Sequence, residues 1–170
     1  LLSDPGFDVM DNFQVAAALA KAIEKVGGAD LVLMGRAAAD FLVAGGHQVV
    51  VVDSDPLRLA NLSPKVEHVV GDVTDDEVLR AAGIAHAGAV IVALETDADT
   101  VYVTLSARAM RPDVTIVSRG RTTGSTGKLE LAGATRAVNP QRIGGRRLAA
   151  FALQPDVAEF LDVVMHDEDL

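Results

Sequence analysis

The sequence predicts an α/β fold, a doubly wound and mostly parallel Rossmann-like sheet flanked by helices. Three observations carry this prediction. Apolar stretches of strand length alternate with helical stretches over residues 29–153. Residues 48–53 hold four consecutive valines, and β-branched side chains on both faces are typical of a strand inside a helix-covered parallel sheet. Glycine and proline mark the ends of most segments.

The composition fits one domain and argues against several classes of protein. A chain of 170 residues with 49% hydrophobic content can bury one core, so we expect a single Rossmann-like domain over residues 1–170. The net charge of −9 argues against nucleic-acid binding. The chain has no cysteine, in keeping with a reducing, cytoplasmic location. No apolar run approaches about 18 residues, so no direct membrane insertion is expected.

The first half of the chain is expected to form three strands and the helices around them. Apolar side chains recur at helical spacing in residues 12–26, and Gly27 ends that helix. Gly45 and Gly46 leave the next helix only about two turns, so the first crossover is tight. The expected elements are a helix at 12–26, a strand at 31–34, a helix at 37–44, the valine strand at 48–53, a helix at 56–60 and a strand at 66–70.

The second half continues the alternation. Thr74 and Glu77 have the spacing of a capping box, which predicts a helix that starts after Thr74 and stops at Gly83. The elements expected after it are a strand at 89–93, a helix at 97–110, a strand at 114–117, a loop at 120–127, a short helix at 128–131, a strand at 135–138 and a helix at 143–153. The last residues are acidic and are expected to form a tail.

Asp53 is the strongest candidate for a binding residue. It ends the valine strand at the carboxyl edge of the predicted sheet, where open α/β sheets bind ligands. A carboxylate in this position typically accepts hydrogen bonds from the ribose hydroxyls of a nucleotide. Ser54 is the next residue and belongs to the same candidate site. The alternative is structural, because Ser54-Asp55-Pro56 is also typical of a turn that leads into a helix.

Gly35 and Arg36 occupy the place of a phosphate-binding loop, between the first buried strand and its helix. A full Gly-x-Gly-x-x-Gly sequence lets backbone N–H groups come close to a pyrophosphate. Here three alanines follow Gly35 and Arg36 instead of the further glycines. Arg36 can meet a phosphate by charge, but we expect pyrophosphate binding to be impaired.

Later strand ends supply five more candidates at the same edge. Asp72 and Val73 follow one strand, Leu94 and Glu95 follow the next, and Arg119 ends a third. Asp72 could face the base side of a nucleotide, or it could serve only as a turn residue before a helix cap. Arg119 could pair with Asp72 or with a ligand, and the sequence leaves both open.

Other motifs argue against catalysis and against a metal site. Residues 124–128, Gly-Ser-Thr-Gly-Lys, resemble a P-loop, but Thr122 replaces its first glycine and Leu129 its magnesium-binding hydroxyl. The only tyrosine, Tyr102, is followed four residues later by Ser106 rather than by the lysine of a reductase. The four histidines lack the spacing of a metal site or a catalytic triad. We therefore expect a protein that is not an enzyme.

An ordered set of short motifs runs through the chain from about residue 39 to residue 162. They are the helix and strand at 39–53, Gly-Asp-Val-Thr-Asp at 71–75, Ala-Gly-Ile at 82–84, Ala-Val-Ile-Val-Ala at 89–93, Val-Ser-Arg at 117–119, Leu-Ala-Gly-Ala at 131–134, Val-Asn-Pro at 138–140 and Arg-Arg-Leu-Ala at 146–149. This set resembles the N-terminal nucleotide-binding lobe of the RCK/TrkA-N family, the regulators of potassium conductance.

The resemblance implies a regulatory domain that binds NAD(H) or an adenine nucleotide. It implies that Asp53 binds the ribose, that Asp72 contacts the adenosine side of the nucleotide, and that Arg119 borders the pocket. It also implies a homodimer or ring, and a potassium channel or transporter as the partner of the full-length protein. Such a domain transmits a signal only if its ligand prefers one of two arrangements of the assembly.

The first 40 residues are similar instead to part of the electron transfer flavoprotein β-subunit family, which binds AMP. The similarity rests on residues 1–7, on the helix through residues 20–26 and on residues 29–40. We therefore interpret the chain as a recombined hybrid with a flavoprotein-like segment at 1–40, an RCK-like core at 41–154 and a tail at 155–170. A divergent natural protein is the alternative. An AMP-binding flavoprotein-like domain and a folded scaffold without a ligand remain alternative functions.

Overall fold

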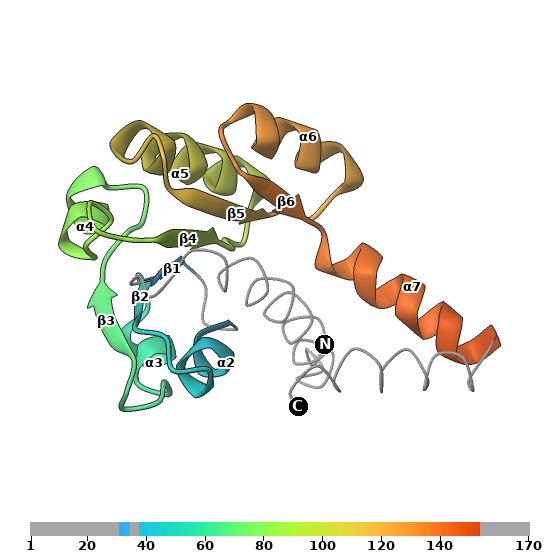
Figure 1. Ribbon diagram of the computed structural model, residues 1–170, viewed down its shortest axis with the longest axis horizontal. Coiled ribbons are helices and arrows are strands. Elements are labelled where there is room, and N and C mark those ends of the chain that lie inside the picture. The colour runs from blue at the N-terminus through green and yellow to red at the C-terminus, as the bar shows by residue number, and fades with distance from the viewer. Residues whose placement is uncertain (1–30, 35–37, 154–170) are drawn as a thin grey trace. The chain divides into compact units, whose positions relative to one another are not determined.

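The computed structural model describes residues 31–34 and 38–153, and it shows a six-stranded parallel sheet with helices on both faces (Figure 1). The strands are β1 (Leu31–Met34), β2 (Val49–Asp53), β3 (Glu67–Val70), β4 (Ala89–Val92), β5 (Thr115–Arg119) and β6 (Arg136–Val138). The helices are α2 (Ala39–Ala44), α3 (Pro56–Leu59), α4 (Asp76–Ala81), α5 (Asp97–Met110), α6 (Thr123–Leu131) and α7 (Pro140–Leu153). The predicted fold class is confirmed.

The strand order is β3-β2-β1-β4-β5-β6, and every neighbouring pair is parallel. Strand β1 therefore lies between β2 and β4, where the order of the strands reverses. In a doubly wound sheet this switch point, at the carboxyl ends of the strands, is where ligands bind. Asp53 ends β2 on one side of the switch point, and Leu94 and Glu95 follow β4 on the other.

The four valines of β2 divide between two hydrophobic clusters, one on each face of the sheet. Val49 and Val51 belong to the cluster covered by α2 and α3, with the fully buried Leu42. Val50 and Val52 belong to the other cluster, which α4 and α5 cover. Successive strand side chains point to opposite faces, so a run of apolar residues fills both layers. The strand lies inside the sheet, as predicted.

Most predicted elements lie within a few residues of the observed ones. The bounds of β1 and α5 agree with the prediction at both ends. Helix α7 begins at Pro140, earlier than predicted, because a proline suits the first helical turn, where its missing N–H has no intrahelical partner. The predicted helix at 12–26, Gly35, Arg36 and the acidic tail lie outside the described residues.

Two local predictions are wrong. Thr74 does not cap α4, because its N–H and its hydroxyl both donate to Asp72 Oδ1, at 2.9 and 2.8 Å. Asp75 caps the helix instead and accepts the N–H of Glu77 at 2.9 Å. The predicted loop at 120–127 is largely helical, since α6 already begins at Thr123.

The start of α6 is fixed by polar contacts that outweigh its two glycines. The hydroxyl of Ser125 accepts the N–H of Thr122 at 3.2 Å and donates to the Thr122 carbonyl at 2.7 Å. Leu129 is fully buried and anchors the helix to the sheet. These contacts offset the poor helix propensity of glycine, which costs about 1 kcal/mol per residue.

The described residues fall into two compact units that divide after Pro140. The sheet and α2 to α6 belong to the first unit. In the second, α7 carries the exposed apolar side chains Leu148 and Leu153, and the guanidinium of Arg147 lies 5.9 Å from the ring centre of Phe151. The single domain expected over the whole chain stays a prediction. Among the described helices, none is both long and apolar enough to cross a bilayer.

Candidate functional site

Asp53 ends β2 with its carboxylate held in place. Its side chain is 16% exposed. Oδ1 accepts the N–H of Asp55 at 2.9 Å, and Oδ2 lies 3.8 Å from Nη1 of Arg58. The turn contact fits the structural alternative, and it also presents a fixed carboxylate at the carboxyl edge. The ribose-binding role of Asp53 stays a prediction.

Arg58 on α3, which was not predicted as a site residue from the sequence, joins the two sides of the switch point. Its guanidinium donates to Glu95 Oε1 at 2.8 Å and lies 3.6 Å from Asp55 Oδ2. The hydrogen bond to Glu95 and the negative charge of Asp53 raise the pKa of Arg58 above its ordinary value. Residues that follow β2 and β4 are thus tied together across the end of β1.

The residues after β4 are also held from the β5 side. Arg119 Nη2 donates to the carbonyl oxygen of Leu94 at 2.7 Å. The guanidinium of Arg121 donates to the carbonyl oxygen of Glu95. The side chain of Leu94 packs against the core, whereas the side chain of Glu95 is 72% exposed. Of the predicted site residues, Leu94, Glu95 and Arg119 therefore come together.

The remaining predicted residues lie at the outer part of the edge or in the core. Asp72 follows β3, is exposed, and accepts two hydrogen bonds from Thr74, which lower the pKa of Asp72. This arrangement fits its alternative role in a turn. The side chain of Val73 packs in the core cluster with Val52. Ser54 is exposed beside Asp53. Gly35 and Arg36 lie outside the described residues.

Asp97 links the start of α5 to the turn that enters α6. Its Oδ1 accepts the N–H of Arg121 at 2.8 Å, and Oδ2 accepts the hydroxyl of Thr122 at 3.3 Å. Burial alone would raise the pKa of Asp97, but hydrogen bonds with Arg121, Ser125 and Thr122 outweigh it and lower the pKa. The contact fixes α5 and α6 next to one another.

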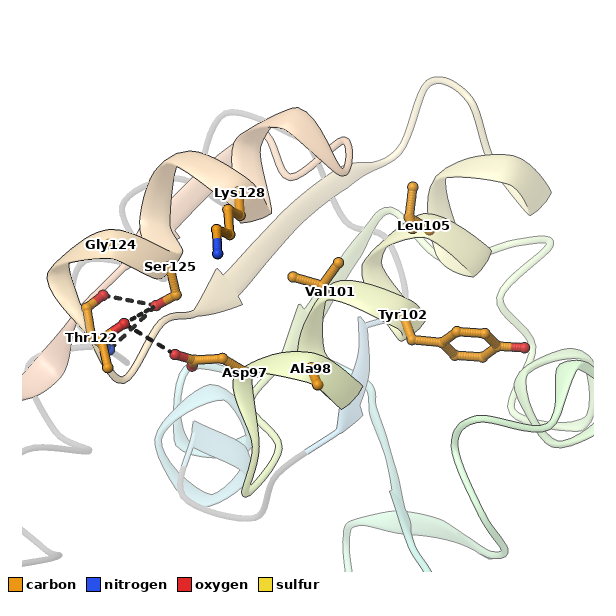
Figure 2. A pocket seen from close by; sticks show the side chains of 9 residues that line it. All are labelled: Asp97, Ala98, Val101, Tyr102, Leu105, Thr122, Gly124, Ser125 and Lys128. Atoms are coloured by element: carbon orange, nitrogen blue, oxygen red, sulfur yellow. Dashed lines mark hydrogen bonds between the residues drawn. The ribbon is translucent and has the colours of Figure 1, made fainter.

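A groove runs between α5 and α6. Figure 2 shows its lining side chains, which come from both helices. Val101, Tyr102 and Leu105 of α5 contribute apolar surface, and Lys128 of α6 contributes a positive charge. Tyr102 and Leu105 are 53% and 51% exposed. This groove was not predicted from the sequence, although Tyr102 and Leu105 lie three residues apart and so on one face of the helix.

Comparisons with known proteins cover the sheet and its helices. A family model described as TrkA-N domain matches residues 31–140. Potassium channel protein 1 of Methanocaldococcus jannaschii is 34% identical over 141 residues, which span 81% of this chain and 42% of that protein. The chain thus spans less than half the length of this relative.

Solved structures of GsuK share the fold. The GsuK RCK domain is 28% identical, with a TM-score of 0.63 over 78% of this chain and 30% of that chain. The GsuK channel bound to NAD is 24% identical, with a TM-score of 0.64 over 82% of this chain and 25% of that chain. GsuK bound to ADP is 23% identical, with a TM-score of 0.68 over 88% of this chain and 39% of that chain.

The comparisons correct one interpretation of the sequence. The family match begins at Leu31, so residues 31–40 match the same family as the rest of the sheet. A flavoprotein-like segment that extends to residue 40, and with it the recombined hybrid, is therefore not supported. Residues 1–30 lie outside the described part of the chain.

Proposed function

The chain belongs to the TrkA-N domain family, and we propose that it is a nucleotide-binding regulatory domain of a potassium channel or transporter. Its ligand is NAD(H) or an adenine nucleotide, and it acts in the cytoplasm by binding rather than by catalysis. The observation that carries the proposal is the position of Asp53, a fixed carboxylate at the carboxyl end of β2, beside the switch point of a six-stranded parallel sheet.

The role of each site residue follows from its place at this edge. Asp53 accepts the ribose hydroxyls, with Ser54 beside it and Asp72 toward the base. Glu95 and Arg119 border the opposite side, where Arg119 holds the Leu94 carbonyl in place. Gly35 and Arg36 follow β1, where the phosphates would lie. NAD and ADP are bound by GsuK, which shares this fold, and that supports the choice of nucleotide.

A titration of the whole chain with NADH, ADP and AMP tests the proposal. A ligand at 100 times its Kd stabilises the folded state by about 2.7 kcal/mol, which raises the melting temperature by several degrees. NADH or ADP should raise it. A shift with AMP alone would identify a mononucleotide as the ligand, and no shift with any of the three would favour a scaffold without a ligand.

We further propose that the domain forms a homodimer or ring. The groove between α5 and α6 supports this assembly, because it exposes apolar side chains next to a charged one (Figure 2). Exposed apolar surface with a polar rim is typical of protein interfaces. A ligand that prefers one arrangement of such an assembly could bias a channel. The molar mass in solution, measured by light scattering, tests the assembly.

A further inference from the structure

The ion pair between Arg58 and Glu95 crosses the carboxyl edge of the sheet at the proposed nucleotide site. The atoms Arg58 Nη2 and Glu95 Oε1 are 2.8 Å apart. Arg58 lies on α3, which follows β2, and Glu95 follows β4. Strand β1 lies between these two strands. The pair therefore spans the switch point, where doubly wound sheets place their ligand.

The backbone at Glu95 is held more firmly than the short helix that carries Arg58. The backbone at Glu95 is fixed from the β5 side, where Arg119 and Arg121 donate to consecutive carbonyl groups. Arg58 lies on a helix of four residues, of which only Leu59 is buried. Leu57 on the same helix is 75% exposed. Because α3 is short and largely exposed, Arg58 can shift away from Glu95 when the pair opens.

Arg58 also lies near other carboxylates, with which it can pair when its contact with Glu95 opens. Its guanidinium already lies 3.8 Å from Asp53 and 3.6 Å from Asp55. A rotation away from Glu95 keeps the positive charge beside these two carboxylates. Opening the pair therefore costs about the free energy of one exposed salt bridge. It does not leave the Arg58 guanidinium without a carboxylate beside it.

We propose that the Arg58–Glu95 pair is an autoinhibitory latch, closed in the ligand-free domain and opened by the nucleotide. The inference rests on the proposed function of the same site. A nucleotide at the switch point must separate the two side chains, so the lost ion pair subtracts from its affinity. An exposed ion pair of this kind corresponds to a change in Kd of about two- to fivefold.

The test uses a double variant that leaves the net charge unchanged. Arg58→Gln with Glu95→Gln removes the latch and, together, alters no net charge beside an anionic ligand. The matched control is Arg80→Gln with Glu77→Gln, which removes the 2.6 Å ion pair on α4. Kd is measured for NADH by its fluorescence and for ADP by calorimetry. Melting temperatures without ligand establish that all variants are folded.

The latch predicts that the double variant binds NADH and ADP about two- to fivefold more tightly than the wild type, and that the control is unchanged. An unchanged or weaker Kd in the double variant, with normal wild-type binding, overturns the latch alone. Binding by the double variant but not by the wild type supports it strongly. If neither binds either ligand, both the latch and the proposed function are rejected.

Discussion

The guanidinium of Arg108 donates to the carbonyl oxygen of Gly133 at 2.9 Å, which ties α5 to the turn between α6 and β6. Gly133 has a φ of +103°, and a Cβ atom built on it would lie 2.7 Å from Cγ of Arg108. The turn thus needs a residue that tolerates positive φ and also has no side chain.

Replacing Gly133 by alanine should destabilise the domain more than the same change at Gly83. Gly83 also has a positive φ, +81°, but its Cβ position is open, so Gly83→Ala should cost about 1–2 kcal/mol of backbone strain. Gly133→Ala adds the clash with Arg108 and should cost at least about 1 kcal/mol more. Urea denaturation measures both. Equal costs would show that the close approach of Arg108 has no energetic effect.

Arg108→Met should lower the free energy of unfolding by about 2 kcal/mol. Arg108 Nη1 donates to the carbonyl groups of Pro112 and Val114, both at 2.8 Å, in addition to the Gly133 contact. Methionine keeps the stem of the side chain and loses these charged donors. Arg80→Met on α4 is the control, and its exposed ion pairs predict a loss below about 1 kcal/mol. A similar loss in both variants would contradict the prediction.

The difference in unfolding free energy between the wild type and the Asp97→Asn variant should become smaller at acidic pH. The pKa of Asp97 is lowered in the folded state, so the carboxylate stabilises the fold at pH values above its unfolded pKa near 3.8. This contribution is lost as the pH falls through the lowered folded value. The difference in unfolding free energy between wild type and variant should be constant above about pH 5 and shrink below pH 4. A difference that is independent of pH would refute the role of the charge.

Asp53→Ala should abolish the rise in melting temperature that NADH produces in the wild type. The reason is the loss of the proposed ribose acceptor at the end of β2. Asp76→Asn, an exposed change on α4, is the control and should keep the full shift. Because Asp53 also accepts the N–H of Asp55, the folding of the variant is checked by circular dichroism. An unchanged NADH shift in Asp53→Ala would reject the assignment.

Leu105→Lys should convert the proposed assembly into a monomer. Leu105 lines the groove between α5 and α6 and is 51% exposed, so a charge there would be buried at an interface (Figure 2). Leu57→Lys is the control. It changes a leucine on α3 that is more exposed than Leu105, and it should leave the assembly intact. Light scattering after size-exclusion chromatography gives the molar mass. A wild-type protein that is already monomeric, or a Leu105→Lys variant that still assembles, would contradict the proposal.

Patterns of side-chain size and polarity predicted most of the fold. Leu31–Met34 and Asp97–Met110 were predicted at their observed bounds because strand and helix periodicity and the residues that end these segments agreed. Helix α6 was predicted too short, because Gly124 and Gly127 weaken the helical pattern while Ser125 restores the start through a side-chain contact. Propensity does not report such contacts.

The candidate site was predicted only in part. Asp53 and Arg119 were found because strand ends of a parallel sheet share one edge. Arg58 was missed, because its contact with Glu95 joins residues 37 positions apart in the sequence and depends on where α3 lies relative to β4. Its place five residues after Asp53, on the first helix beyond the acid, is the signal that could have identified it.

The place of β1 in the strand order has a consequence for how the chain folds. Leu31 pairs with Ala89, and the chain between them contains two other strands and three helices. Contacts between positions so distant in sequence slow folding, because loop closure precedes any gain from the contact. During synthesis, the side of β1 that pairs with β4 therefore stays open until β4 has emerged, and chaperones bind apolar surface that is exposed in this way.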